Sequence, residues 1–153
     1  MKNLMSTLDR EKLSSWRIYF ETTARIQTVL ERELKDQVNM HLGDYNVLLA
    51  LTEAEGGKMR LGDLARTIVF SPARLTYLMR SLEQRGLVKR SADSDDRRGA
   101  YAMITRTGRL RFSKARAVHL KQINDLVLRD LEPEEALVLK RVFARVSEKI
   151  EHT

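Results

Sequence analysis

Apolar residues recur at intervals of three and four positions along two long segments, one towards each end of the chain. In residues 9–38 the series is Trp16, Tyr19, Phe20, Thr23, Ile26, Leu30 and Leu34, and after Pro133 it is Leu139, Val142, Phe143, Val146 and Ile150. This spacing predicts an apolar stripe along each of two amphipathic helices. Because a helix as long as the first cannot bury its stripe against a small domain alone, we expect it to pack against a partner, such as another chain. The apolar side chains available for such an interface are Trp16, Tyr19, Phe20, Leu139, Val142, Phe143 and Val146.

Between these segments the pattern changes to short elements separated by glycine and polar residues. Gly43-Asp44-Tyr45 is predicted to open a helix with Asp44 as its N-cap, and Glu55-Gly56-Gly57-Lys58 is predicted to end it. Met59-Arg60-Leu61 fits a minimal strand, and residues 63–68 fit a short helix.

Residues 71–88 contain the clearest single element of the chain, a short helix with defined ends. Ser71 is a strong N-cap, Pro72 suits the first helical position, and Gly86 suits the turn after the last one. The positions spaced for the core are Leu75, Leu78, Met79 and Leu82. The opposite face carries Ala73, Arg74, Tyr77, Arg80 and Gln84. A short helix with a basic outer face fits the major groove of DNA.

A hairpin and a further helix follow. Residues 87–90 and 100–104 alternate well enough for two strands, joined by the polar loop 91–99. Thr105 is expected to cap the next long helix, and Pro133 to occupy the first position of the last one.

Positive charge is concentrated in the middle of the chain. Residues 74–116 contain 12 Lys/Arg and 4 Asp/Glu, a net of +8, out of a formal charge of +7 for all 153 residues. The remainder therefore has a net charge of −1. A basic segment between nearly neutral flanks indicates a surface for a polyanion.

Several classes of protein are disfavoured by what the sequence lacks. There are no cysteines, so disulfides, thiolate zinc sites and cysteine nucleophiles are excluded. No apolar run has the length of a membrane span, and the first ten residues do not form a signal peptide, so we expect a cytoplasmic protein without membrane contact. No carboxylate cluster, nucleophile–base pair or glycine-rich phosphate loop is present, so we expect neither an enzyme nor a cofactor.

The hairpin ends in a motif that has an Asp-x-Arg, then apolar-x-apolar-Thr, then x-x-Gly, and that runs from Asp96 to Gly108. With Leu64-Ala65 and Leu82-Glu83-Gln84-Arg85-Gly86-Leu87-Val88 before it, the chain resembles the MarR family (multiple antibiotic resistance regulators) over roughly residues 13–150. Two positions depart from the usual motif, because Ala102 replaces a larger aliphatic residue and Ile104 replaces leucine.

This resemblance implies a mainly α fold with a small β-hairpin wing. A winged helix-turn-helix lobe at residues 44–105 is expected between dimerisation helices at 9–40 and 106–153, all within one chain of residues 1–153. The resemblance further implies a homodimer on a pseudo-palindromic double-stranded operator, a ligand site between the dimer helices and the lobe, and an Asp96–Arg98 salt bridge in the wing.

The residue types suggest how such a lobe contacts DNA. Arg74, in the first turn of its helix, is placed for a guanine, and small Ala73 for a thymine methyl group. Ser71 and the helix start suit a phosphate, and a basic hairpin tip suits the minor groove. The expected DNA contacts are Ser71, Pro72, Ala73, Arg74, Thr76, Tyr77, Arg80, Arg97 and Arg98.

We therefore predict a repressor that a small aromatic or amphipathic effector releases from DNA, with Trp16, Tyr19 and His41 as candidate pocket residues. One alternative is an activating or metal-sensing member of the same fold. His41, His119 and His152 lack the spacing of a zinc site, so no metal is expected. The other alternative is a winged-helix module that binds only proteins, against which the arginines on the presumed DNA side argue.

Overall fold

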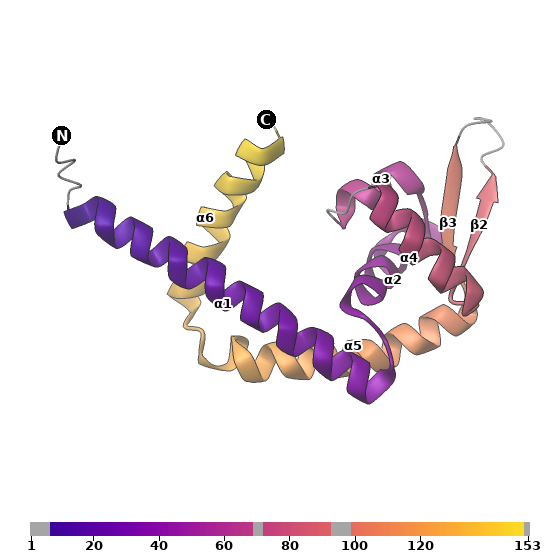
Figure 1. Ribbon diagram of the computed structural model, residues 1–153, viewed down its shortest axis with the longest axis horizontal. Coiled ribbons are helices and arrows are strands. Elements are labelled where there is room, and N and C mark those ends of the chain that lie inside the picture. The colour runs from indigo at the N-terminus through magenta and orange to yellow at the C-terminus, as the bar shows by residue number, and fades with distance from the viewer. Residues whose placement is uncertain (1–6, 69–71, 93–98, 152–153) are drawn as a thin grey trace. The chain divides into compact units, whose positions relative to one another are not determined.

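The structure is a computed structural model that describes residues 7–68, 72–92 and 99–151. It contains six α-helices, two short 3₁₀ turns and a three-stranded sheet in these ranges (Figure 1). In chain order the elements are α1 (Thr7–Val38), α2 (Leu42–Glu53), η1 (Glu55–Gly57), β1 (Lys58–Arg60), α3 (Leu61–Thr67), α4 (Pro72–Gln84), β2 (Val88–Ala92), β3 (Ala100–Ile104), α5 (Arg106–Leu126), η2 (Leu128–Asp130) and α6 (Pro133–Glu151). The predicted mainly α fold with a hairpin is confirmed.

The chain divides into two compact units, one up to His119 and one from Leu120 onward, with the boundary inside α5. The finer division into a lobe at 44–105 and dimerisation helices on either side of it stays a prediction. No helix in the described ranges has the length and apolar character that a membrane span requires.

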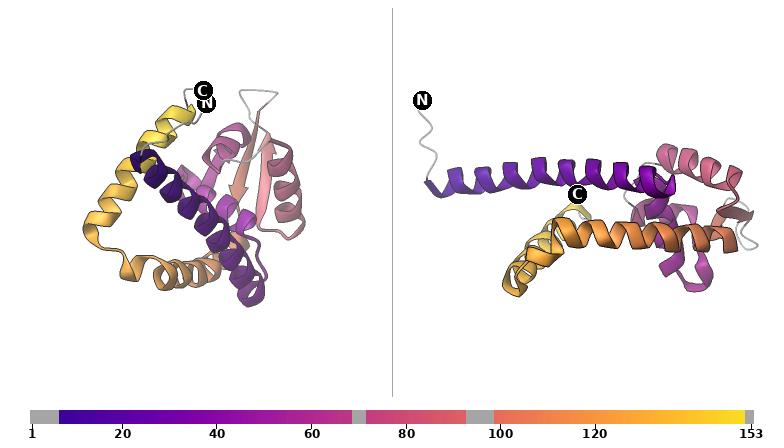
Figure 2. Two further views of the ribbon diagram at one scale, coloured as in Figure 1. Left: turned by 60° about the vertical axis from the view of Figure 1, so that its left-hand side comes forward. Right: turned by 90° about the horizontal axis from the view of Figure 1, so that it is seen from below.

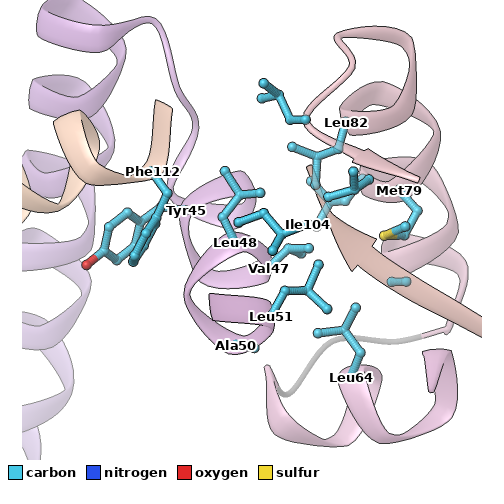
Figure 3. Packing of buried hydrophobic residues seen from close by; sticks show 14 of the residues in the cluster. Tyr45, Val47, Leu48, Ala50, Leu51, Leu64, Met79, Leu82, Ile104 and Phe112 are labelled. Carbon is cyan, nitrogen blue, oxygen red and sulfur yellow. The ribbon is translucent and has the colours of Figure 1, made fainter. Parts of the chain in front are cut away.

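The core of the first unit is built around α2, whose side chains meet α3, α4 and the sheet (Figure 3). The prediction that one face of α4 packs into the core is confirmed, because Leu75, Leu78, Met79 and Leu82 are all buried. Full burial of such a side chain stabilises the fold by about 1.5–3 kcal/mol. These contacts fix which face of α4 turns to solvent.

The start of α2 differs from the prediction. The helix begins at Leu42 with His41 as its N-cap residue, and Asp44 lies in the first turn. From there the Asp44 carboxylate accepts a hydrogen bond from the His41 amide at 3.3 Å, since an acidic side chain three residues into a helix reaches back to the cap. The same carboxylate is buried and pairs with the Arg85 guanidinium at 2.8 Å, which ties α2 to the end of α4.

The sheet is antiparallel, with strand order β1-β3-β2. β1 and β3 confirm the predicted strands, with β1 one residue earlier than expected, and β2 extends to Ala92. The register pairs Val88 with Ile104 and Ala92 with Ala100, so β2 and β3 form the stem of the predicted wing. α3 begins at Leu61, two residues before the predicted start.

The α4–β2 turn and the start of α5 pack together closely. Gly86 has φ of +68°, and the Leu87 amide donates to the Leu82 carbonyl oxygen at 2.9 Å, as in a Schellman helix end. The Thr105 hydroxyl donates to the Gly86 carbonyl oxygen at 2.7 Å and accepts from the Gly108 amide at 2.9 Å. The predicted cap at Thr105 is confirmed, and its side chain also joins α5 to the end of α4.

The long helices expose much of their apolar surface within the single chain. α1 buries only Leu30 and Leu34, and its N-terminal half projects from the lobe that contains α2, α3, α4 and the sheet (Figure 2). Trp16 and Phe20 are 57% and 62% exposed. In the second unit, α6 starts at Pro133 as predicted, and Leu139 and Val146 remain exposed.

Candidate nucleic-acid interface

One face of α4 is turned outward by the packing of its other face. Five of the predicted contact residues on α4 have exposed side chains. They are Ala73, Arg74, Thr76, Tyr77 and Arg80. Tyr77 is 73% exposed, which is unusual for a large aromatic side chain in a packed lobe. The outer face therefore combines two arginines with an aromatic and two small side chains.

Ion pairs at the other end of α4 hold the helix in place. Arg85 pairs with Asp44 of α2, and Glu83 pairs with Arg90 of β2 at 3.0 Å. Glu83 is the sole acidic residue of α4, and its carboxylate is paired with the Arg90 guanidinium. The ion pairs thus fix the C-terminal half of α4, and the side chains of Arg74 and Arg80 are exposed to solvent.

The remaining predicted contacts lie outside the described residues. This applies to Ser71, to the side chain of Pro72, and to Asp96, Arg97 and Arg98 in the wing. The described structure gives the stem of the wing, whose last pair is Ala92 with Ala100. The Asp96–Arg98 salt bridge therefore stays a prediction.

A cleft of about 890 Å³ lies where α1, α2 and α4 meet. Its wall includes His41, as predicted for an effector pocket, but Trp16 and Tyr19 do not line it. It also includes Arg74 and Tyr77 from the outer face of α4. The cleft and the candidate DNA surface therefore share two side chains.

Glu31 of α1 closes one side of this cleft and was not identified from the sequence. Its carboxylate lies 2.5 Å from His41 Nδ1 and accepts the Leu42 amide at 2.6 Å. Burial acts to raise the pKa of Glu31, but the hydrogen bonds from His41 and Leu42 and the nearby charges outweigh it, so this pKa is lowered. The sequence offered no signal for Glu31, because it is one of many charged residues on the polar side of α1.

His119 of α5 is half-buried beside Tyr45, with ring centroids 4.4 Å apart. Its Nδ1 is buried and makes no hydrogen bond within the described ranges. Burial lowers the pKa of His119. Among the residues that the structure describes, no three His, Asp or Glu side chains gather as a metal site would require.

As the pH is lowered, we expect the free energy of unfolding to fall first through protonation of His119 and only later through protonation of carboxylates. Because the pKa of His119 is below its ordinary 6.5, the unfolded chain takes up a proton that the folded chain resists, and the free energy of unfolding falls as pH drops below 6.5. Glu31 acts later, since its lowered pKa stabilises the fold above 4.5 and this contribution is lost only at lower pH. Urea unfolding at about pH 7.5 and about pH 5.5 would measure the first effect. His119→Gln should flatten that difference, and an unchanged difference in the variant would contradict the assignment to His119.

Comparison with known proteins agrees with this geometry. The MarR family model matches residues 42–99, which run from the start of α2 to the wing. A comparison with curated protein sequences found no match.

Solved structures match over almost the whole chain. AbsC, a MarR family transcriptional regulator from Streptomyces coelicolor, is 26% identical with a TM-score of 0.90, over 99% of this chain and 100% of that one. Sco3205, a MarR family transcriptional regulator of the same organism in complex with DNA, is 24% identical with a TM-score of 0.88, over 96% and 91%. NadR in complex with 4-hydroxyphenylacetate is 20% identical with a TM-score of 0.69, over 95% and 96%. The MarR family model thus matches the segment from α2 to Gly99, and over almost its whole length the chain is similar in fold to transcriptional regulators of the MarR family.

Proposed function

We propose that the chain is a homodimeric, sequence-specific regulator of transcription that binds a pseudo-palindromic operator in double-stranded DNA. The observation that carries this proposal is the outward face of α4, where Arg74, Tyr77 and Arg80 stand exposed on a helix whose opposite face is fully packed. A rigid helix with exposed arginines suits the major groove, whose base edges give each base pair its own pattern of donors and acceptors. The DNA-bound relative Sco3205 supports the same use of this fold.

Position along α4 supports a division of roles among these residues. The N-terminal turn of a recognition helix lies nearest the base edges, so Arg74 reads a guanine and Ala73 permits close approach to a thymine methyl group. Ser71 and Pro72 at the helix start hold a phosphate, and Thr76, Tyr77 and Arg80 contact a base or the backbone. Arg97 and Arg98 enter the minor groove from the wing, with Asp96 positioning Arg98.

A dimer supplies the second half-site. The exposed Trp16, Tyr19 and Phe20 rings form one apolar cluster, with centroids 5.7 and 5.8 Å from Trp16 to its two neighbours. These rings are exposed to water in a single chain, and their burial against a second copy would stabilise a dimer. α6 contributes Leu139, Val142, Phe143 and Val146 to the same role.

The cleft between α1, α2 and α4 supports repression that a ligand relieves. Arg74 and Tyr77 line this cleft and also belong to the DNA face, so a small aromatic or amphipathic molecule held there competes with DNA for them. NadR, solved with 4-hydroxyphenylacetate, shows that a protein of this fold takes up a small aromatic acid. Of the three residues predicted for an effector pocket, His41 lines this cleft.

Salt dependence of DNA binding tests the proposal. Fluorescence anisotropy with a labelled duplex from the region beside the coding sequence would be measured at about 50 and about 200 mM salt. A dimer with 6–10 phosphate contacts should lose roughly 10³–10⁵ in affinity between these conditions.

A matched control replaces the exposed Lys140 and Arg141 of α6 by glutamine, which removes two charges outside the proposed DNA face. This variant should bind as the wild type does, while Arg74→Gln/Arg80→Gln should bind weakly. Absence of duplex binding at low salt would favour the protein-interaction alternative.

A further inference from the structure

The strand register places a set of basic side chains together on the face of the sheet that turns away from the core. Two cross-strand rows result, Arg60–Tyr101–Ser91 and Lys58–Met103–Lys89. The row between them, Met59–Ala102–Arg90, turns to the other side, where Ala102 is fully buried. We call the six residues of the first two rows the outer sheet face.

The outer sheet face is exposed and strongly basic. Lys58, Arg60, Lys89 and Ser91 are exposed, and Tyr101 and Met103 are half-buried. The three strands contain four Lys/Arg and no Asp/Glu, and the fourth cation, Arg90, pairs with Glu83 on the opposite face. Three cations on one small face without an acidic residue in the same strands fit a polyanion.

Tyr101 holds two of these cations close together. The Arg60 Nε donates to the Tyr101 hydroxyl at 3.3 Å, and Arg60 Cζ lies 5.5 Å from the ring centroid. On the same ring, Lys58 Nζ lies 5.4 Å from the centroid. Cation–π contacts of this kind orient long side chains and leave both of them charged.

The outer sheet face is continuous with the wing. Ser91 and Tyr101 lie within two residues of the ends of the wing stem, and β2 and β3 run from there back beside α4 (Figure 1). Two residues along a strand span about 7 Å. The second row, with Lys58 and Lys89, therefore lies about 7 Å farther along the strands from the wing than the first row does. A duplex whose minor groove receives the wing continues past it, and its backbone is a regular polyanion.

We propose that the outer sheet face binds the phosphate backbone of the duplex that flanks the operator beyond each wing. This inference rests on the proposed DNA-binding function and adds to it a second, sequence-independent contact. Lys58, Arg60 and Lys89 engage phosphates, Tyr101 holds the first two in place, and the dimer thereby covers more DNA than its recognition helices and wings read.

Two duplexes with the same selected operator test this proposal. One ends at the outer edge of the operator, and the other continues for about 10 base pairs on each side, one helical turn. The wild type should bind the longer duplex roughly 10³-fold more tightly at about 50 mM salt, the factor that six added phosphate contacts provide relative to about 200 mM. Lys58→Gln/Arg60→Gln/Lys89→Gln should bind both duplexes alike and keep the wild-type affinity for the short one. On the long duplex its slope of log K against log salt should be smaller by about 5, since each of six lost phosphate contacts contributes about 0.9.

The control removes the same number of charges from α6, as Lys140→Gln/Arg141→Gln/Arg145→Gln, and should keep the preference for the long duplex. Lys58→Arg/Lys89→Arg should also keep it, because the charges are retained, and thermal unfolding of each variant checks that the lobe is intact. A wild type that binds both duplexes equally, or a triple variant that weakens equally on both, would overturn the inference and leave the proposed function standing. A wild type that binds neither duplex would instead refute the proposed function.

Discussion

Replacing Arg74 by alanine is expected to lower the affinity for the preferred operator by roughly 30-fold to 10⁴-fold, because each half-site loses one arginine–guanine contact worth about 1–3 kcal/mol. Arg74 is exposed on the first turns of α4, whose opposite side is fixed by Leu75, Leu78 and Met79. The variant should therefore remain folded and lose discrimination at one base pair in each half-site. Binding to duplexes with every base at each position would measure this loss.

Arg98→Ala provides the contrast, because a wing arginine in the minor groove contributes mainly to affinity and little to base identity. It should weaken binding to most sequences by a similar factor. If Arg74→Ala and Arg98→Ala lost the same affinity on every duplex, the division between reading by α4 and anchoring by the wing would be wrong.

Gly108→Ala is expected to destabilise the fold strongly. A Cβ at this position would lie 2.1 Å from the Leu87 carbonyl oxygen and 2.9 Å from Ile104 Cγ1. The nearest neighbour is backbone and already accepts a hydrogen bond from the Thr105 amide at 3.1 Å, so it cannot move without loosening the junction. Overpacking of this kind costs about 1–3 kcal/mol or more, and chemical denaturation would measure it.

Gly62→Ala is the matched control, since a Cβ there meets nothing within 4 Å and the residue lies in α3. Alanine favours a helix over glycine by up to about 1 kcal/mol, so this variant should be neutral or slightly more stable. Equal destabilisation by the two substitutions would contradict a role for Gly108 in close packing.

The junction at Gly108 also explains part of the family motif in physical terms. The Thr-x-x-Gly at its end places a hydroxyl at Thr105 that bonds α5 to the α4–β2 turn, and a glycine at Gly108 that lets the helix approach Leu87. The Thr-x-x-Gly part of the motif thus sets the wing stem and the start of α5 against the end of α4.

Local patterns predicted the elements that depend on local physics. Ser71-Pro72 and Gly86 predicted the limits of α4, and its start at Pro72 and turn at Gly86 are confirmed, because caps and positive φ are properties of a few neighbouring residues. The spacing of Leu75, Leu78, Met79 and Leu82 likewise determined which face of α4 turns outward.

Features that depend on packing between distant residues could not be predicted in this way. Asp44 was expected to be the N-cap of α2, but the N-cap is His41, whose amide donates to Asp44. Asp44 also pairs with Arg85, 41 positions away, a partner that local sequence does not reveal. Glu31 closes the cleft beside His41 because α1 and α2 meet there, which no periodicity reveals. The outer sheet face required the strand register, since Lys58, Lys89 and Tyr101 come from three separate strands.

Selection of binding sites from a pool of random duplexes tests most directly whether two copies of the lobe read DNA together. The purified protein should enrich an inverted repeat whose half-sites are about one helical turn apart, with a guanine contact that disappears in Arg74→Ala. Enrichment of no sequence, or of a single half-site by a monomer, would contradict a dimeric regulator.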